Sequence, residues 1–453
     1  MTQTSMFFAT PRFRHAFRVA VATIIAYWLA LSFDWPNPKW AALAVAVVSL
    51  PSTGESLKKG RQRLMGTLVG AVVTLVIVSL FPQDHWTFLF CVSAWLAFCT
   101  YRMGDPRKSN FWYVSGFVVA IVATNVGSDL RDAFEIAVIR SLETGLGVVV
   151  YSVVALLIWP DKEAKGRQPD STIQATVGTT VDLDRLAATA RFFVTFWLGI
   201  FFVLYIPGVP GGMKYLGLLA SFSMQLSNMP QYPISLLYRP LVVSLVFASL
   251  FYMLLMPRLE GFIPLAIAVF AVTFFIVYHY YEPQKVIARS IGLALFVAVI
   301  AVSNEQQYSF LSAANVTLMI FLLCASSLIT AHLPVSTLPE KRLMWQLRRF
   351  QRSARYLSDE QNASPGPLGR YLRTYHFYEI TTLPGKLAAW RGFIPEHLKA
   401  PVAVELDSVM EDVQRTSQAL QKGHRPEEGL LTRVADSYGI IGDSPLTQPR
   451  YRT

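Results

Sequence analysis

An arginine and a glutamate inside a long apolar stretch are the side chains best suited to chemistry in this 453-residue chain. Arg140 and Glu143 stand three residues apart, so on a helix they share one face. A charged side chain within a bilayer is costly, and it usually marks a substrate or proton pathway. The pair could bind an anionic substrate and accept a proton, or it could be a structural pair that holds one helix against its neighbours.

Two short segments interrupted by proline and glycine supply further candidates. One runs over 40–53, and its counterpart in the second half of the chain runs over 215–229. Interrupted segments at matching places in two halves are typical of transport sites, because a broken helix frees backbone groups for a ligand. Gln225 and Asn228 lie next to the second break, although an ordinary helix end at the membrane surface would explain the same pattern.

Paired positions in the two halves complete the set of candidates. They are Lys39 and Lys214 in the outer loops, Arg63 and Arg239 near the start of matched segments, and Asn125 and Asn304 at the ends of two similar stretches. The lysines could attract organic anions or anchor helix ends, and asparagine can hydrogen-bond between helices. Arg63 is expected at the cytoplasmic edge, where a long side chain reaches water at little cost.

The elements that hold these side chains are predicted to be transmembrane helices. The chain is 53% hydrophobic and only 15% charged, whereas soluble domains are roughly 25% charged. Apolar runs occur over 15–33, 40–53, 64–81, 86–101, 111–127, 133–159, 190–206, 215–229, 240–256, 262–280, 290–304 and 309–333. We therefore predict an all-α integral membrane protein with about 12 transmembrane helices.

Charge asymmetry between the loops gives the orientation. If the N-terminus is inside, the loops on that side carry most of the lysines and arginines. The opposite loops contain only Lys39, Arg131, Lys214 and Arg258. Since cytoplasmic loops carry the excess of basic residues, both termini are predicted to be cytoplasmic. The net charge of +11 then needs no nucleic acid partner.

The two halves resemble each other. FVVAIVATN at 117–125 matches FVAVIAVSN at 296–304, and Lys39-Trp40 matches Lys214-Tyr215 at nearly the same separation. Each half has six segments, an even number, so both insert the same way up as parallel repeats. The predicted parts are a first six-helix membrane repeat at 1–160, a cytoplasmic linker at 161–187, a second six-helix membrane repeat at 188–335 and a cytoplasmic helical tail at 336–453. In the tail, 340–362 and 400–422 have helical patterns.

The sequence indicates no cofactor, no metal site and no enzymatic activity. Cys91, Cys99 and Cys324 lie in apolar runs, without a CxxC or a Cys/His pair at metal spacing, and buried free cysteines usually behave as small apolar residues. A phosphate-binding GxxxxGK[ST] loop is also missing, so nothing indicates direct use of ATP.

Three motifs together resemble those of the fusaric acid resistance and aromatic acid exporter family. They are R-x-x-G-T-x-x-G at 63–70, R-x-x-E-T at 140–144 followed by Gly147 or the neighbouring Gly145, and Trp159-Pro160. The resemblance is best over 12–160, and 190–335 matches as a degenerate second repeat. It implies a Gram-negative inner-membrane efflux component that exports aromatic carboxylic acids with the proton gradient. A periplasmic adaptor and an outer-membrane channel are the partners it implies. Longer family members carry a large cytoplasmic domain between the halves, where this chain has only its linker.

The leading hypothesis is a proton-coupled exporter of small hydrophobic organic anions. Arg140 would bind the carboxylate and Glu143 would carry the proton. One alternative is a non-transport membrane scaffold or envelope regulator, whose tail recruits a cytoplasmic partner. The other is an organic-anion channel, which would use the same basic residues without proton coupling. Membrane lipids surround the protein in each case, and parallel repeats with flat small-residue faces would also allow a homodimer.

Overall fold

The structure is a computed structural model that divides into two compact units. It describes residues 10–50, 53–81, 83–125, 130–159, 181–209, 211–228, 234–282, 285–306, 308–330, 333–335, 339–359, 366–391 and 399–424. Over these residues the regular structure is helical. The membrane unit comprises Met1–Arg167 and Ala188–Thr330, and the tail unit comprises Gln168–Ala187 and Ala331–Thr453.

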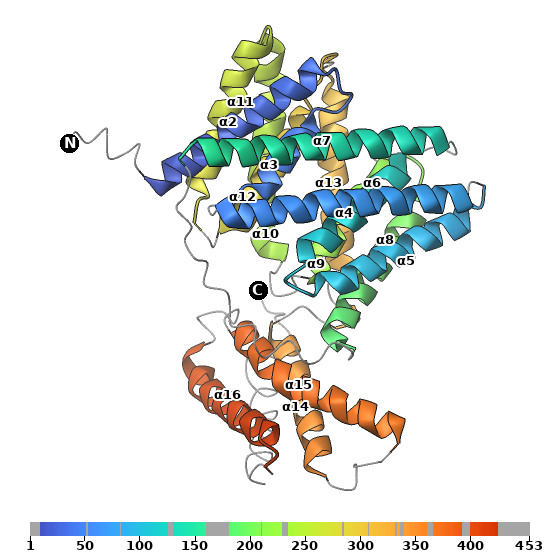
Figure 1. Ribbon diagram of the computed structural model, residues 1–453, viewed down its shortest axis with the longest axis vertical. Helices are drawn as coiled ribbons and strands as arrows, with labels where there is room; N and C mark the ends of the chain where they lie inside the picture. Colours follow the sequence, from blue (N-terminus) through green and yellow to red (C-terminus); the bar gives the residue numbers. More distant parts are fainter. Residues whose placement is uncertain are drawn as a thin grey trace, which may run out of the picture. The chain divides into compact units, whose positions relative to one another are not determined.

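All twelve predicted apolar segments lie on helices (Figure 1). These are α2 (Pro11–Ser32), α3 (Lys39–Val48), α4 (Thr53–Leu80), α5 (His85–Met103), α6 (Ser109–Asn125), α7 (Leu130–Leu157), α8 (Leu183–Tyr205), α9 (Met213–Asn228), α10 (Ile234–Leu250), α11 (Phe262–His279), α12 (Val286–Ile300) and α13 (Phe310–Thr330). A π-helical turn, η1 (Phe251–Leu255), and a 3₁₀ turn, η2 (Met256–Arg258), extend α10.

Seven helices in the described part of the chain are long and apolar enough to cross a membrane. They are Pro11–Ser32, Gly54–Leu80, Ala133–Leu157, Leu183–Tyr205, Arg239–Arg258, Phe262–His279 and Ala313–Thr330. The helices over Lys39–Val48, Ser109–Thr124 and Val286–Ile300 are apolar but shorter. The chain is therefore a multi-pass helical membrane protein, and the twelve crossings in two parallel repeats stay a prediction.

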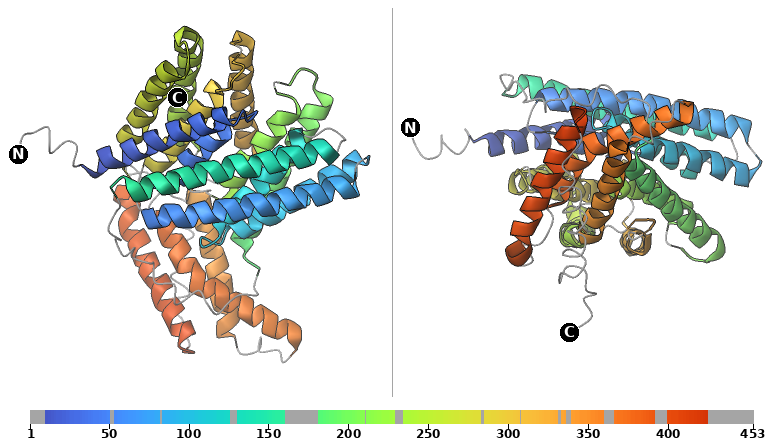
Figure 2. Two further views of the ribbon diagram at one scale, coloured as in Figure 1. Left: turned by 45° about the horizontal axis from the view of Figure 1, so that its top comes forward. Right: turned by 90° about the horizontal axis from the view of Figure 1, so that it is seen from below.

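Small residues let the helices of the first half approach closely. A Cβ atom on Gly66 or Gly70 would lie 2.6 Å from the carbonyl oxygen of Phe111 or Ser115 on α6, so α4 packs directly against the α6 backbone. α7 packs against α4 and α3, and α4 and α7 lie side by side in Figures 1 and 2. This is the close approach that the small-xxx-small spacing predicts.

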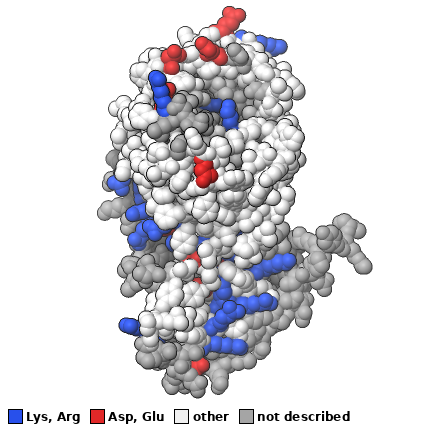
Figure 3. Space-filling view, turned by 90° about the vertical axis from the view of Figure 1, so that its right-hand side faces the viewer, with Lys and Arg blue, Asp and Glu red and all other residues white. Residues whose placement is uncertain are grey.

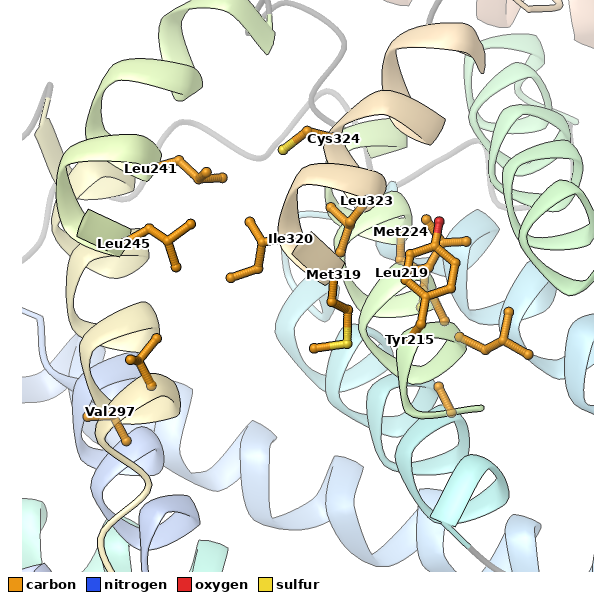
Figure 4. Packing of buried hydrophobic residues seen from close by; sticks show 14 of the residues in the cluster. Tyr215, Leu219, Met224, Leu241, Leu245, Val297, Met319, Ile320, Leu323 and Cys324 are labelled. Carbon is orange, nitrogen blue, oxygen red and sulfur yellow. The ribbon is translucent and has the colours of Figure 1, made fainter. Parts of the chain in front are cut away.

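A large apolar cluster combines buried residues of both halves. In Figure 4, Met319 and Leu323 of α13 lie beside Tyr215 and Leu219 of α9, while Ile320 points toward α10. Many large apolar side chains on α4 and α7 remain exposed, and Figure 3 shows a broad uncharged face on the membrane unit. Lipid tails can cover such a face, because the helices satisfy their own backbone hydrogen bonds.

The tail unit contains a small helical core of its own. It has α14 (Pro339–Ser358), α15 (Pro367–Arg391) and α16 (Lys399–Gln421), drawn in orange to red in Figure 2. The sequence predicted the first and third of these helices. It missed α15, whose charged, aromatic and proline residues obscure the apolar spacing. The buried apolar side chains of the tail unit include Leu347, Phe350, Leu383, Leu387 and Val413.

Buried ion pairs connect the helices of the tail unit. Arg349 on α14 donates from Nε to Glu379 Oε2 on α15 at 2.9 Å, and the same guanidinium lies 3.2 Å from Asp184 at the start of α8. Lys386 on α15 donates to Asp184 at 2.6 Å. Because each buried charge has an opposite partner, the network fixes the register between these segments.

Candidate functional site

α7 holds Arg140 and Glu143 on one face, as their spacing predicts. Arg140 Nη1 lies 4.0 Å from Glu143 Oε2. The Glu143 side chain is fully buried, and that of Arg140 is 13% exposed. The Arg140 guanidinium carbon lies 3.7 Å from the ring centroid of Trp40 on α3, which is a cation–π contact. Neither the Arg140 Nη1 atom nor the two Glu143 oxygens have a hydrogen-bond partner of normal geometry.

Lys39 and Lys214 join this pair, although they come from different helices. Lys39 begins α3 and Lys214 lies in the first turn of α9. The charges of Arg140, Lys214 and Glu143 all act on the Lys39 ammonium, and the Asn37 backbone N–H lies near Glu143. We call Lys39, Trp40, Arg140, Glu143 and Lys214 the Trp40 cluster. With three cations and one carboxylate, it keeps a net positive charge even when Glu143 is ionised.

Arg63 lies inside a helix and away from water. α4 begins at Thr53, so Arg63 is in the third turn of the helix, and it is only 3% exposed. The expectation that Arg63 reaches water at the membrane edge is therefore wrong. The reason is that the preceding basic residues continue the helix, which carries Arg63 into the packed interior.

Arg63 and Arg140 line one small cavity between α3, α4, α6 and α7. Its volume is about 10 Å³, which is room for roughly one water molecule. The lining residues are Trp40, Arg63, Thr67, Val114, Phe117, Val118, Ile121, Val122, Arg140 and Thr144. Apolar and aromatic walls with two guanidinium groups suit an aromatic anion, but the cavity is closed to one in this structure.

Tyr113 connects Gln225 to the same region, and sequence reasoning missed it. Its hydroxyl lies 2.7 Å from Ser221 Oγ on α9, and it also interacts with Gln225 and Arg63. A tyrosine within an apolar run of α6 carries no sequence signal of this role. Gln225 therefore lies close to the cavity, on the short helix α9 that was predicted to shape the site.

The remaining candidates lie apart from the Trp40 cluster. Asn228 Nδ2 donates to the carbonyl oxygens of Thr100 and Met224, at 3.1 Å in each case. Asn304 Nδ2 donates to Leu31 O at 3.1 Å. The hydrogen bond to Thr100 ties α9 to α5, and the hydrogen bond to Leu31 ties the segment after α12 to α2.

The structure places neither Arg239 nor Asn125 in the Trp40 cluster, and the same holds for the predicted proline breaks. Arg239 is exposed on α10. The Asn125 side chain lies outside what the structure describes, as do the proline breaks after α3 and α9. α3 is nevertheless short, since its ten residues end at Val48.

The described helices are those of a multi-pass membrane protein, with a buried cluster of charged side chains between them. Residues 12–192 match the family model described as "Fusaric acid resistance protein family", and this confirms the family resemblance for the first half of the chain.

Several curated bacterial proteins are similar to part of this chain. The "Uncharacterized transporter YdhK" of Salmonella typhimurium is 28% identical over 163 residues, which cover 35% of this chain and 24% of that protein. The "p-hydroxybenzoic acid efflux pump subunit AaeB" of Enterobacter cloacae is 26% identical over 178 residues, which cover 36% of this chain and 27% of that protein. The matches thus span about a quarter of these relatives. The relatives are named as transporters or as an efflux pump subunit. No solved structure matches the chain.

Proposed function

We propose that this protein exports small hydrophobic organic anions, such as aromatic carboxylic acids, across the inner membrane of a bacterium. The observation that carries the proposal is the Arg140 guanidinium, stacked on Trp40 beside the buried Glu143. A guanidinium can hold a carboxylate through two parallel hydrogen bonds, and Arg140 Nη1 has no such partner at present. Trp40 and Phe117 offer aromatic surface to the ring of the substrate.

Glu143 gives the site a means of coupling to protons. The ionised Glu143 and the substrate carboxylate compete for the same guanidinium. Protonation of Glu143 ends that competition, so anion binding at Arg140 and the protonation state of Glu143 are linked.

The membrane potential supports the same direction of transport. Moving a unit negative charge from the negative interior to the outside gains about 2.3 kcal/mol per 100 mV. A voltage-driven anion channel is therefore the second candidate, favoured by the excess of cations over carboxylate in the Trp40 cluster.

Transport requires the closed cavity to open. A space of about 10 Å³ is far below the roughly 300 Å³ of a typical ligand pocket. Movement of α3 and α6 away from α4 and α7 would widen it. In a larger assembly, a periplasmic adaptor and an outer-membrane channel would carry the anion onward, since the relative AaeB is named as a pump subunit.

The test is uptake of radiolabelled 4-hydroxybenzoate into inverted membrane vesicles that contain the full chain. An imposed pH gradient should drive uptake in the wild type. Glu143→Gln should reduce that gradient-driven uptake about tenfold or more, because general acid–base groups typically contribute 10²–10⁴-fold. Glu135→Gln is the matched control on the same helix, since Glu135 is exposed and pairs with Arg131.

Three results would count against the proposal. Full gradient-driven transport by Glu143→Gln would remove the proposed role of that carboxylate. Uptake that follows voltage but ignores the pH gradient would favour the channel. No uptake of any member of a broad panel of organic acids would favour a scaffold or regulator.

A further inference from the structure

A second group of basic side chains lies at the opposite end of α3 from the Trp40 cluster. Arg289 on α12 is 2% exposed and His15 on α2 is 1% exposed. Arg289 Nη1 lies 3.3 Å from His15 Nε2, and Arg289 Nη2 donates to the Ser49 carbonyl oxygen at 3.5 Å. Lys59 on α4 lies within reach of the Arg289 charge. We call His15, Lys59 and Arg289 the Arg289 cluster.

The Arg289 cluster has no carboxylate partner among the residues that the structure describes. The three side chains form no ion pair there. The acidic residue on the segment before α12 is Glu282, which is already paired with Arg12 at 3.1 Å and Lys285 at 2.9 Å. A further cation, Arg18, acts on His15. Burial of a guanidinium without a counter-charge is costly, so proteins normally pair it.

The hydrogen bonds leave one buried donor of the cluster without an acceptor. A guanidinium can only donate, so His15 Nε2 accepts from Arg289 and the neutral imidazole carries its proton on Nδ1. His15 Nδ1 is buried and has no hydrogen-bond partner. The Ser49 carbonyl at the end of α3 compensates part of the charge, because a helix C-terminus carries roughly half a negative charge. The unpartnered Nδ1–H of His15 and the remaining positive charge of Arg289 favour an anion at this place.

We propose that the Arg289 cluster is a second subsite, which binds the carboxylate of the transported organic anion. The ten residues of α3 separate it from the Trp40 cluster by about 15 Å. Arg63 lies between the two subsites, because it lines the cavity with Arg140 and its charge also acts on Lys59. The three positions thus form a row of basic side chains along α3, which an anion could follow once the helices move apart. Only the identity of the anion rests on the proposed function.

His15 provides a direct readout of binding at this subsite. The full chain, labelled with ¹⁵N-histidine and reconstituted in phosphatidylcholine nanodiscs, is titrated with benzoate while the imidazole nitrogen signals are followed by NMR. His15→Gln identifies the His15 signals among the seven histidines. We expect a saturable shift of the Nδ1 signal. In Arg289→Gln the half-saturation concentration should rise about tenfold or more, because a charged hydrogen bond is lost.

Matched variants separate this subsite from the Trp40 cluster. Arg258→Gln, which removes an exposed cation, should leave the titration unchanged. Arg140→Gln should abolish transport yet leave the His15 response intact. If Arg289→Gln does not fold, Arg289→Lys is the alternative. It keeps the positive charge but loses the planar guanidinium, so it should bind benzoate several-fold more weakly than the wild type.

The outcomes distinguish this inference from the proposed function. A His15 signal that ignores benzoate, or an Arg289→Lys protein that binds like the wild type, would overturn the subsite. A lipid headgroup is the other possible anion: if phosphatidylglycerol shifts His15 without benzoate and benzoate does not compete, the subsite is also overturned. Saturable binding at His15 in a protein that transports no acid would sink the proposed function and leave the subsite standing.

Discussion

At the scale of single residues, the planar shape of the guanidinium explains why arginine occupies position 140. The Arg140 guanidinium carbon lies over the Trp40 ring, 3.7 Å from its centroid, and a planar guanidinium there can still present its edge to a carboxylate. A lysine ammonium is a compact, strongly hydrated charge, which can neither stack nor bind in a bidentate manner. The same chemistry recurs at Arg289, which contacts His15 and the end of α3 through two different nitrogen atoms.

Arg140→Lys should therefore weaken substrate binding more than it slows turnover. A desolvated cation–π contact contributes up to about 2 kcal/mol, so we expect the KM for 4-hydroxybenzoate to rise about tenfold with a smaller change in kcat. Initial uptake rates over a range of substrate concentrations measure both. Arg131→Lys on the same helix is the control, since that side chain is 83% exposed. An unchanged KM would argue against the stacked geometry as a binding device.

A second prediction at this scale concerns His376 in the tail unit. His376 Nδ1 lies 3.0 Å from Ser353 Oγ, and its ring lies 4.2 Å from that of Tyr356. Burial, and then the charge of Arg352, lower the pKa of His376 below its ordinary value. Near pH 6.5 the unfolded chain takes up a proton that the folded tail does not, so folded stability falls as the pH falls.

Hydrogen exchange of α14 and α15 in the full chain measures this effect. After correction for intrinsic rates, protection should be weaker at pH 5.5 than at pH 7.5. His376→Gln should lose that component of the pH dependence. Burial raises the pKa of Glu379 against the opposing effect of Arg349, which gives a pH dependence of opposite sign. The difference in pH dependence between His376→Gln and the wild type therefore isolates the contribution of His376. Identical pH profiles of protection in the two proteins would refute its role.

At the scale of elements, the contact between α3 and α7 positions the Trp40 cluster. Gly147 allows it, because a Cβ atom there would lie 2.2 Å from the Ala41 carbonyl oxygen on α3. The family motif left open whether Gly145 or Gly147 is the required glycine. The structure decides for Gly147, since a Cβ atom on Gly145 would meet only Leu64 Cδ2, at an ordinary 3.7 Å.

Gly147→Ala should consequently destabilise the protein and displace Trp40 from Arg140. Overpacking of this kind typically costs about 1–3 kcal/mol. Thermal unfolding of the purified full chain in detergent should give a lower Tm for Gly147→Ala, together with reduced uptake. Gly145→Ala, the same change two residues away, should behave like the wild type. Equal Tm values for the two variants would show that α3 and α7 do not pack this closely.

At the scale of the whole molecule, helices of the two halves pack against each other reciprocally. α3 of the first half contacts α12 of the second, and α9 of the second half contacts α6 of the first. Along the chain α9 is the sixth helix after α3, and α12 is the sixth after α6. This exchange is therefore what a two-fold relation would produce. The parallel repeat remains a prediction, and its topology can be measured.

Reporter fusions test the orientation directly. Green fluorescent protein at either terminus should fluoresce, because both termini are predicted to be cytoplasmic. Alkaline phosphatase inserted in the loop at 34–38 should be active, since that loop is predicted to be periplasmic. The same insertion at 104–108 should be inactive and serves as the control. Active phosphatase at residue 453 would contradict the predicted even number of crossings.

The sequence by itself determined the class of protein and the place of every apolar helix in the membrane unit. Apolar runs separated by polar loops can be recognised locally, because each run must satisfy its backbone by forming a helix. The sequence also singled out Arg140 and Glu143, since charge in such a run is rare. It could not locate α15, whose fold depends on contacts in the tail unit rather than on its own apolar spacing.

Only the tertiary structure decided which polar side chains meet. It brought Lys39, Lys214 and Trp40 to Arg140, drew Arg63 into the interior, and tied Asn228 and Asn304 into helix contacts. It also assembled His15, Lys59 and Arg289, which come from three helices far apart in the chain. The physical reason is that helix packing selects partners through shape and close approach, such as that at Gly147, and residues distant in sequence carry no local signal of those contacts.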